Sequence, residues 1–238
     1  VTARSTFPHV RILSEERELL VVLMVDVSGS LNFGSVSLTK ADRVAETAAV
    51  LALSAVRNND RVALLTFSNR VHDYIPPDKD RTHALGIVKR ILEASEHHHR
   101  ESADANQALT FLGQVLKRRA MVFLISDFRY GEETDRLLGS FAKRHDLVGI
   151  HVFDPRETRV PPVGRIRFRD PETGTERLAD TNSRRWQEEF NRAVQARAAA
   201  REALCRRARV DLVSISTADD LMLPLRKFFE LRKRRRRH

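Results

Sequence analysis

The sequence predicts an α/β fold in which a mostly parallel, doubly wound sheet is flanked by helices. Leu19 to Val25 is an unbroken run of seven apolar residues, which is typical of a strand buried on both faces of a parallel sheet and too short to cross a membrane. A second run, Met121 to Ser126, has the same character, and strands alternate with helical segments along much of the chain. We therefore expect Leu19 to Val25 to form the central strand.

The elements of the first two thirds of the chain follow from the spacing of their apolar residues. Lys40 to Val56, for example, places Val44, Ala48, Leu51 and Ala55 on one helical face. In order, we expect an extended segment over 8–13, a polar turn over 14–17, the central strand, a helix over 40–56, a strand over 61–67, an edge strand over 71–75 that Pro76-Pro77 ends, helices over 83–94 and 103–116, a strand over 121–126, a helix over 133–143 and a strand over 147–153.

The last third of the chain departs from this rhythm. Residues 164–180 are predicted to form a β-hairpin insertion, because turn residues over 170–174 separate two short segments. A long helix is expected from near Ser183, with Trp186 and Phe190 in the core, followed by a strand over 211–215. The final helix starts either at a capping box over 217–220 or at Leu223, since Pro224 would break the earlier start. We expect one domain, 1–238.

The charge of the chain is concentrated at its C-terminus. The formal net charge is +10, but the basic tail, 232–238, holds six consecutive Lys or Arg residues, which leaves the rest at about +4. Aromatic residues make up only 6% of the chain, so we expect no specific nucleic-acid binding, which needs basic side chains on a folded face with aromatics for stacking. We expect a solvated or disordered tail with weak attraction to anionic surfaces.

Cysteine content and apolar runs bear on the location of the protein. Cys205 is the only cysteine, which excludes an intrachain disulfide and a thiolate zinc site and favours a reducing, cytoplasmic environment. No basic-then-apolar leader and no apolar run of membrane-spanning length are present in the sequence. The sequence therefore predicts a cytoplasmic protein.

Oxygen-bearing side chains follow both apolar strands. Asp26, Ser28 and Ser30 alternate along the loop after the first strand, and Asp127 directly follows the other. Because parallel strands gather their C-terminal loops at one edge of the sheet, we expect Asp26 and Asp127 to converge there. Hard divalent cations prefer such oxygens. The alternative is that Asp26 caps a helix and the serines form a turn.

The segment DVSGS, residues 26–30, resembles the Asp-x-Ser-x-Ser signature of von Willebrand factor A (VWA) domains. The segments EERELLVVLMVDVSGSLNFGS, NNDRVALLTFS, VLKRRAMVFLISDF, DPRE and RFRDPETG also resemble, in the same order, the bacterial family called domain of unknown function 58. This resemblance covers nearly the whole chain. It implies a VWA fold with a metal-ion-dependent adhesion site for Mg²⁺. VTAR at the start resembles the middle of a family motif, which implies a further segment upstream.

The same resemblance assigns the second loop of the metal site. In the family this loop carries Thr followed by Asp, and these positions correspond to Ala103 and Asp104 of this sequence. Ala103 has no ligand atom, so we expect Ser102 or a water to substitute and Mg²⁺ to bind more weakly. The expected metal ligands are therefore Asp26, Ser28, Ser30, Ser102, Asp104 and Asp127.

Members of this family are commonly encoded beside MoxR-type AAA+ ATPases. The resemblance thus implies a non-enzymatic interaction module that acts with a MoxR-type AAA+ ATPase in a chaperone-like or complex-maturation role. The alternatives are a Mg²⁺-dependent phosphoester hydrolase and a metal-free scaffold. The sequence has no nucleophile elbow and no phosphate loop, and Ser28 stands where a phosphatase of the haloacid dehalogenase type needs a second Asp. We expect His97-His98-His99 to be solvent-exposed rather than a metal site.

Overall fold

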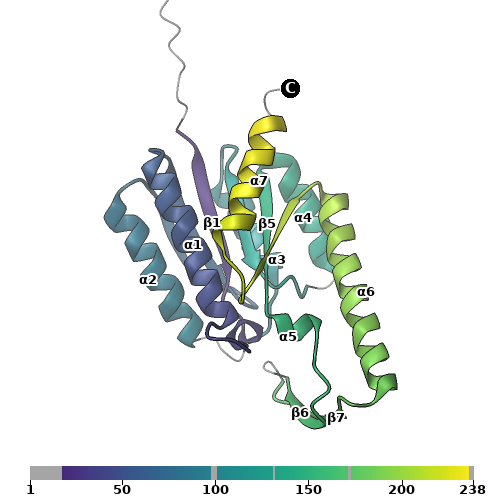
Figure 1. Ribbon diagram of the computed structural model, residues 1–238. Helices are drawn as coiled ribbons and strands as arrows, with labels where there is room; N and C mark the ends of the chain where they lie inside the picture. Colours follow the sequence, from purple (N-terminus) through teal and green to yellow (C-terminus); the bar gives the residue numbers. More distant parts are fainter. Residues whose placement is uncertain (1–17, 98–100, 131, 171–172, 236–238) are drawn as a thin grey trace, which may run out of the picture.

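The computed structural model describes residues 18–97, 101–130, 132–170 and 173–235, and it shows a six-stranded sheet with helices on both faces (Figure 1). The strand order is β3-β2-β1-β4-β5-β8, in which β3 is antiparallel and the other strands are parallel. This arrangement confirms the predicted α/β class and the central position of the first apolar strand. The elements are β1 Leu20–Asp26, η1 Gly29–Asn32, α1 Lys40–Arg57, β2 Arg61–Phe67, β3 Val71–Asp78, α2 Arg81–His97, α3 Ala105–Val115, β4 Met121–Ser126, α4 Glu132–Arg144, β5 Asp146–Phe153, α5 Pro155–Thr158, β6 Arg165–Arg169, β7 Glu176–Asp180, α6 Arg184–Ala208, β8 Asp211–Ser216 and α7 Met222–Arg235.

The sheet is apolar on both faces because successive residues of a strand point to opposite sides. Leu23 and Val25 of β1 pack with residues of α1, α2 and α7, whereas Val22 and Met24 pack with residues of α3, α4 and α6. All four side chains are fully buried. The double burial explains why the first strand is continuously apolar rather than alternating.

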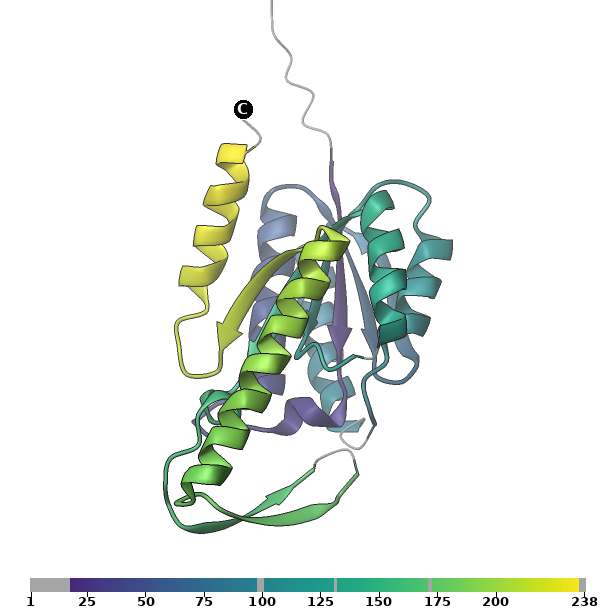
Figure 2. The ribbon, with the colours of Figure 1, turned by 90° about the vertical axis from the view of Figure 1, so that its right-hand side faces the viewer.

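The C-terminal ends of the parallel strands meet at one edge of the sheet. β1 and β4 are neighbours, and their register sets Val25 beside Ile125. Asp26 and the residues after β4 therefore emerge next to each other. The short helix α5 and the β6–β7 hairpin lie at the same end of the molecule (Figures 1 and 2).

The hairpin is an antiparallel pair separate from the main sheet, as predicted. Phe168 of β6 stacks on Trp186, and Trp186 stacks on Phe190, with ring centroids 5.7 and 5.2 Å apart. The prediction that Trp186 and Phe190 belong to the core is wrong, since both are only partly buried. The N-terminal turns of α6 extend beyond the sheet towards the hairpin (Figure 2), so these rings form a satellite cluster that attaches the hairpin.

The edge strand β3 continues further than the sequence predicts. We expected Pro76-Pro77 to end it, but it runs to Asp78, which pairs with Val62 across a register shift. Proline removes a backbone donor, and an edge strand tolerates this loss because it has a neighbour on one side only. The register shift is the irregularity that lets two prolines remain in the strand.

The basic tail is also more ordered than expected. Arg232 lies in α7 and forms ion pairs with Asp146 and Asp211, at the starts of β5 and β8, and its guanidinium carbon lies 5.5 Å from the centroid of the Phe228 ring. Residues 232–235 are thus helical, so the disordered alternative is wrong for them, whereas Lys233, Arg234 and Arg235 are exposed, as the solvated alternative expects. The start of α7 at Met222 lies one residue from the predicted Leu223.

Some predictions fall on residues outside the described ranges. These are the extended segment over 8–13, the turn over 14–17, His98-His99 and the last three residues of the tail. His97 ends α2, and its Nδ1 lies 2.6 Å from the Glu93 carbonyl oxygen. Among the helices that the structure describes, none combines the length and apolar character of a membrane span.

Candidate functional site

The first loop of the site is folded around Asp26, the last residue of β1. One carboxylate oxygen of Asp26 accepts the backbone N–H of Ser28 at 2.9 Å, and the other accepts the hydroxyl of Ser126 at 2.7 Å. The hydroxyls of Ser28 and Ser30 lie 3.3 Å apart. Asp26, Ser28 and Ser30 are all buried. The structure therefore brings these three predicted site residues together.

Asp127 follows β4 and contacts a buried lysine that the sequence did not identify. Lys40 Nζ lies 3.0 Å from Asp127 Oδ2 and 2.8 Å from Glu157 Oε1, and its side chain is fully buried. Arg129 forms a second bridge to the same two carboxylates. The other oxygen of Asp127, Oδ1, is buried and makes no hydrogen bond of standard geometry, although the Ser30 hydroxyl is close enough to the carboxylate to help lower its pKa. Two cations thus balance Asp127 and Glu157, and one carboxylate oxygen stays without a standard hydrogen bond.

The two aspartates of the site have opposite pKa shifts. Burial and the negative charge of Asp127 raise the pKa of Asp26 to about 7, although hydrogen bonds from Ser126 and Ser28 oppose the shift. Burial also raises the pKa of Asp127, but the charges of Lys40 and Arg129 outweigh it, so this pKa lies below its ordinary value. The charge of Asp127 acts on Asp26 because the two carboxylates converge at the sheet edge, as the sequence predicts.

The start of α1 places Lys40 in the site. Thr39 caps this helix, since its hydroxyl accepts the N–H of Asp42 at 3.1 Å and the Asp42 carboxylate accepts the N–H of Thr39 at 2.9 Å. Lys40 is therefore the first helical residue, a position where the helix dipole disfavours a cation. This mismatch is the sequence signal for Lys40: a lysine at the positive end of a helix needs a carboxylate partner.

The turn after β4 is strained and depends on a glycine of the neighbouring strand. Phe128 has a φ of +58°, which bulky residues rarely adopt. Its N–H donates to the Ser126 hydroxyl at 3.0 Å. A Cβ at Gly149 of β5 would lie 2.7 Å from the Phe128 ring. Gly149 therefore lets the ring pack against β5, which fixes the backbone next to Asp127.

The second loop lies beside the first, and its Asp104 carboxylate caps a helix. The carbonyl of Glu101 accepts the N–H of Gly29 at 2.8 Å, and the N–H of Asp104 donates to the carbonyl of Ser68 at 2.8 Å. The Asp104 carboxylate caps α3 by accepting a backbone N–H at 2.8 Å, and Ser102 is exposed. The predicted helix start at 103 is thus two residues early. Among the residues that the structure describes, neither Ser102 nor Asp104 forms a hydrogen bond with Asp26 or Asp127.

Asp154 fixes the far end of the first loop. Its carboxylate accepts the N–H of Ser35 at 2.8 Å and the hydroxyl of Thr217 at 3.0 Å, and it also accepts the Ser35 hydroxyl. Asp154 caps α5, the short helix that carries Glu157. The DPRE segment, 154–157, therefore anchors the first loop and supplies a partner for Lys40. A carboxylate directly after a third parallel strand is the signal that could have revealed this.

The side chains fit a hard divalent cation only if hydroxyls take part. Among the described residues, no three His, Cys, Asp or Glu side chains gather into a metal-ligand group. Asp26, Ser28, Ser30 and Asp127 together offer two carboxylates and two hydroxyls, and Mg²⁺ accepts such oxygens while keeping several waters. The unpartnered Oδ1 of Asp127 is a buried acceptor that calls for a donor or a cation. Lys40 already forms an ion pair with Asp127, so a bound metal ion and the Lys40 ammonium would both contact the Asp127 carboxylate.

Comparison with known proteins agrees with this fold. The model of the family described as "Protein of unknown function DUF58" matches residues 1–200. "Uncharacterized protein Rv1480" of Mycobacterium tuberculosis is 30% identical over 234 residues, which cover 98% of this chain and 74% of that protein.

Two solved structures share the architecture at low sequence identity. The conserved hypothetical protein BatB from Bacteroides thetaiotaomicron has a TM-score of 0.57 and 13% identity, over 90% of this chain and 98% of BatB. An aerotolerance-related membrane protein from Bacteroides fragilis has a TM-score of 0.58 and 14% identity, over 84% of this chain and 92% of that chain. At these identities the likeness concerns the fold alone. On its sequence match, the chain belongs to the DUF58 family.

Proposed function

We propose that this chain is a protein-interaction module whose site at the sheet edge binds Mg²⁺ and, through it, an acidic side chain of a partner. The observation that carries the proposal is the meeting of Asp26, Asp127 and the hydroxyls of Ser28 and Ser30 in a buried cluster. Mg²⁺, when bound, would supply a positive charge with open coordination positions for a carboxylate of the partner.

The charge distribution within the cluster supports a cation. Lys40 and Arg129 neutralise Asp127 and Glu157. No cation forms an ion pair with Asp26 among the described residues, and burial beside Asp127 makes its ionised form unfavourable. A divalent ion would relieve this cost by favouring the ionised carboxylate. Ser126 and the Ser28 N–H hold the Asp26 carboxylate in place for this purpose.

We infer the partner class from the family. Membership of DUF58, whose members are commonly encoded beside MoxR-type AAA+ ATPases, supports a MoxR-type AAA+ ATPase as the partner and a chaperone-like or complex-maturation role. Adhesion through a metal suits this role, because a single coordinated carboxylate can be released and bound again as the partner changes conformation.

A metal-free scaffold is the second candidate, and Lys40 is the observation that favours it. The buried ammonium already contacts Asp127 and Glu157, so the site could keep its shape without a metal. The hydrolase alternative gains no such support. In the described part of the chain, Ser28 hydrogen-bonds to Asp26 and Ser30 and to no histidine. Ser68 does contact His72, but Ser68 is fully buried.

The test is binding of a purified MoxR-type AAA+ ATPase, measured with the ATPase immobilised, in Mg²⁺ and in EDTA. We expect EDTA and Asp26→Asn each to weaken binding by about tenfold or more, which is about 1.4 kcal/mol. Asp219→Asn is the matched control, because Asp219 is an exposed carboxylate in the loop after β8. Binding that persists in EDTA and is lost in Lys40→Met would support the metal-free scaffold instead. Absence of binding to the ATPase under every condition would reject the proposed partner.

A further inference from the structure

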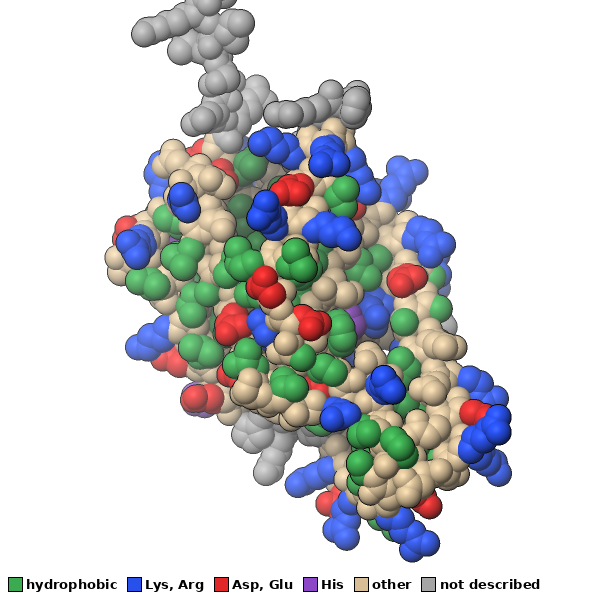
Figure 3. Space-filling view, in the orientation of Figure 1, with side chains coloured by type: hydrophobic (Ala, Val, Ile, Leu, Met, Phe, Trp, Pro, Cys, Tyr) green, Lys and Arg blue, Asp and Glu red, His purple; other side chains and the backbone are tan. Residues whose placement is uncertain are grey.

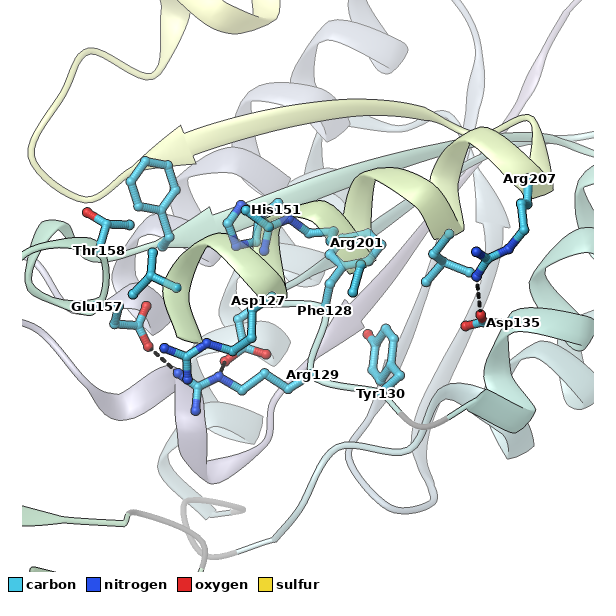
Figure 4. A pocket seen from close by; sticks show the side chains of 16 residues that line it. Asp127, Phe128, Arg129, Tyr130, Asp135, His151, Glu157, Thr158, Arg201 and Arg207 are labelled. Carbon is cyan, nitrogen blue, oxygen red and sulfur yellow. Dashed lines mark hydrogen bonds and ion pairs between the residues drawn. The ribbon is translucent and has the colours of Figure 1, made fainter. Parts of the chain in front are cut away.

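A cavity of about 630 Å³ lies between α6 and the C-terminal ends of β4 and β5. Asp127, Arg129 and Glu157 line one end, and the Arg207–Asp135 ion pair lies at the other (Figure 4). His151 and Arg201 lie between these two ends (Figure 4). The volume falls within the range of about 300 to 1,000 Å³ that small-molecule sites occupy.

Three buried polar atoms that line this cavity and can face an anion have no hydrogen-bond partner. They are Tyr130 Oη, His151 Nδ1 and Arg201 Nε. His151 is more than nine-tenths buried, with 7% of its surface exposed. The unpartnered Oδ1 of Asp127 also lines the cavity, but a carboxylate oxygen repels an anion and belongs to the cation site described above. Buried polar groups are nearly always hydrogen-bonded, so a cluster of unpartnered ones in one hollow indicates a place where a polar ligand binds.

The charges around the cavity leave two arginines uncompensated. Each carboxylate in the lining is paired, since Asp127 and Glu157 bind Lys40 and Arg129, and Asp135 binds Arg207. Arg197 and Arg201 form no ion pair among the described residues. Arg201 is partly buried beside His151. Burial of His151 and, to a smaller extent, the positive charge of Arg201 lower the pKa of His151 to about 3. The imidazole is therefore neutral at pH 7. The unbalanced charge of the cavity is therefore positive.

The helix α6 presents these arginines between apolar residues. Val194, Arg197, Ala198, Arg201 and Leu204 recur at intervals of one helical turn and all line the cavity. Phe128 and Phe153 add aromatic surface from the opposite side. Lys and Arg side chains also gather over α6, α7 and the hairpin on the face shown in Figure 3, so the surroundings attract anions. The cavity thus combines apolar walls with guanidinium groups, which bind carboxylates and phosphates through paired N–H donors.

We propose that this cavity is a binding site for a small organic anion, a carboxylate or phosphate ester on an apolar body. Arg201, supported by Arg197, binds the anionic group. Tyr130 and His151 hydrogen-bond to it or to a neighbouring polar atom, and the apolar face of α6 covers the body of the ligand. This site does not depend on Mg²⁺ or on the partner proposed above.

The experiment is calorimetric titration of the whole chain, in EDTA and at matched ionic strength, with phenyl phosphate, benzoate and the neutral probe benzyl alcohol. We expect saturable binding of at least one anionic probe and none of benzyl alcohol. Arg201→Met should weaken binding by about tenfold or more. Arg192→Met is the matched control, because Arg192 is exposed on the same helix and does not line the cavity, and it should bind like the wild type.

A second variant keeps the test independent of the folding of Arg201→Met. Val194→Trp retains both arginines but places an indole in the cavity, so it should also weaken binding by about tenfold while far-UV circular dichroism stays unchanged. The proposal is overturned if neither anion binds, if benzyl alcohol binds equally well, or if Arg192→Met loses as much affinity as Arg201→Met. Binding that needs Mg²⁺ and is lost in Asp26→Asn would place the anion on the metal site and also reject the cavity. Failure of partner binding alone would leave this result untouched.

Discussion

Asp26 and Asp127 end neighbouring strands, yet the protein treats their charges differently. Asp127 has Lys40 and Arg129 as partners, whereas Asp26 has hydrogen-bond donors and no ion pair in the described structure. The pKa of Asp26 is therefore raised to about 7 and that of Asp127 is lowered. At neutral pH the site holds one stable negative charge and one that costs free energy.

This difference predicts a pH-dependent stability. The pKa of Asp26 is higher in the folded state, about 7 against 3.8, so its contribution to stability is present at low pH and is lost as pH rises from about 4 to about 7. Asp127 has the opposite sign, since its contribution is lost as pH falls. In EDTA near pH 8, Asp26→Asn should raise the free energy of unfolding by about 2 kcal/mol, measured by urea denaturation. The gain should shrink towards pH 4. An equal effect at both pH values would show that Asp26 is not destabilised by its charge.

Ala103 stands where the family resemblance places a ligating Thr, so a substitution there tests the second loop of the site. If it occupies the position of a ligating Thr, Ala103→Thr should strengthen Mg²⁺ binding, because a hydroxyl replaces water in the coordination shell. The expected gain is about tenfold or less, measured by calorimetry, with Ser102→Ala as the comparison variant. An unchanged affinity in Ala103→Thr together with loss in Ser102→Ala would show that Ser102 is the ligand of the second loop.

At the scale of elements, the end of α7 has a structural role that its composition conceals. Arg232 is mostly buried and pairs with Asp146 and Asp211, whereas Arg234 is exposed without an ion pair in the described chain. Arg232→Ala should therefore lower the free energy of unfolding by about 1 to 2 kcal/mol, and Arg234→Ala should change it by less than about 0.5 kcal/mol. Thermal or urea unfolding measures both. If both variants change the free energy of unfolding equally, Arg232 has no structural role and the tail is only solvated.

Most elements could be predicted because one signal, apolar periodicity, controls them. The strands over 61–67 and 121–126 have the predicted bounds, and α1 differs by one residue. The errors arise where tertiary contacts override that signal. Pro76-Pro77 remains in a strand because β3 is an edge strand. Trp186 packs on the hairpin because the N-terminal turns of α6 extend beyond the sheet. A charged run such as 232–235 reads as solvated until its partners at the starts of distant strands are known.

The candidate site shows the same division. Asp26, Ser28, Ser30 and Asp127 could be placed together from the sequence, because their position after parallel strands determines where they emerge. The sequence signals at Lys40 and at the segment 154–157 show that each needs a partner or follows a strand, but they do not name Asp127 as the group that Lys40 meets, because the approach of each helix start to Asp127 depends on the crossover geometry. The unpartnered atoms of the cavity come from the loop after β4, from β5 and from α6, and no local pattern links them.

At the scale of the whole molecule, the two apolar layers on either side of the sheet hold the fold, and the site lies at the end where both layers stop. Val27 and Leu31 of the first loop belong to one of these layers, whereas the polar side chains of Asp26, Ser28 and Ser30 do not. Polar substitutions at these three positions therefore leave the apolar side chains in place, and the candidate site can be tested in the intact chain.

The most direct measurement of the central claim is a calorimetric titration of Mg²⁺ into the wild-type chain and Asp26→Asn, with Asp219→Asn as the control. Our account predicts one saturable site in the wild type and in Asp219→Asn, and an affinity weaker by about tenfold or more in Asp26→Asn, because that variant loses a charged oxygen ligand. The absence of saturable Mg²⁺ binding in the wild type, or an equal affinity in Asp26→Asn, would contradict it.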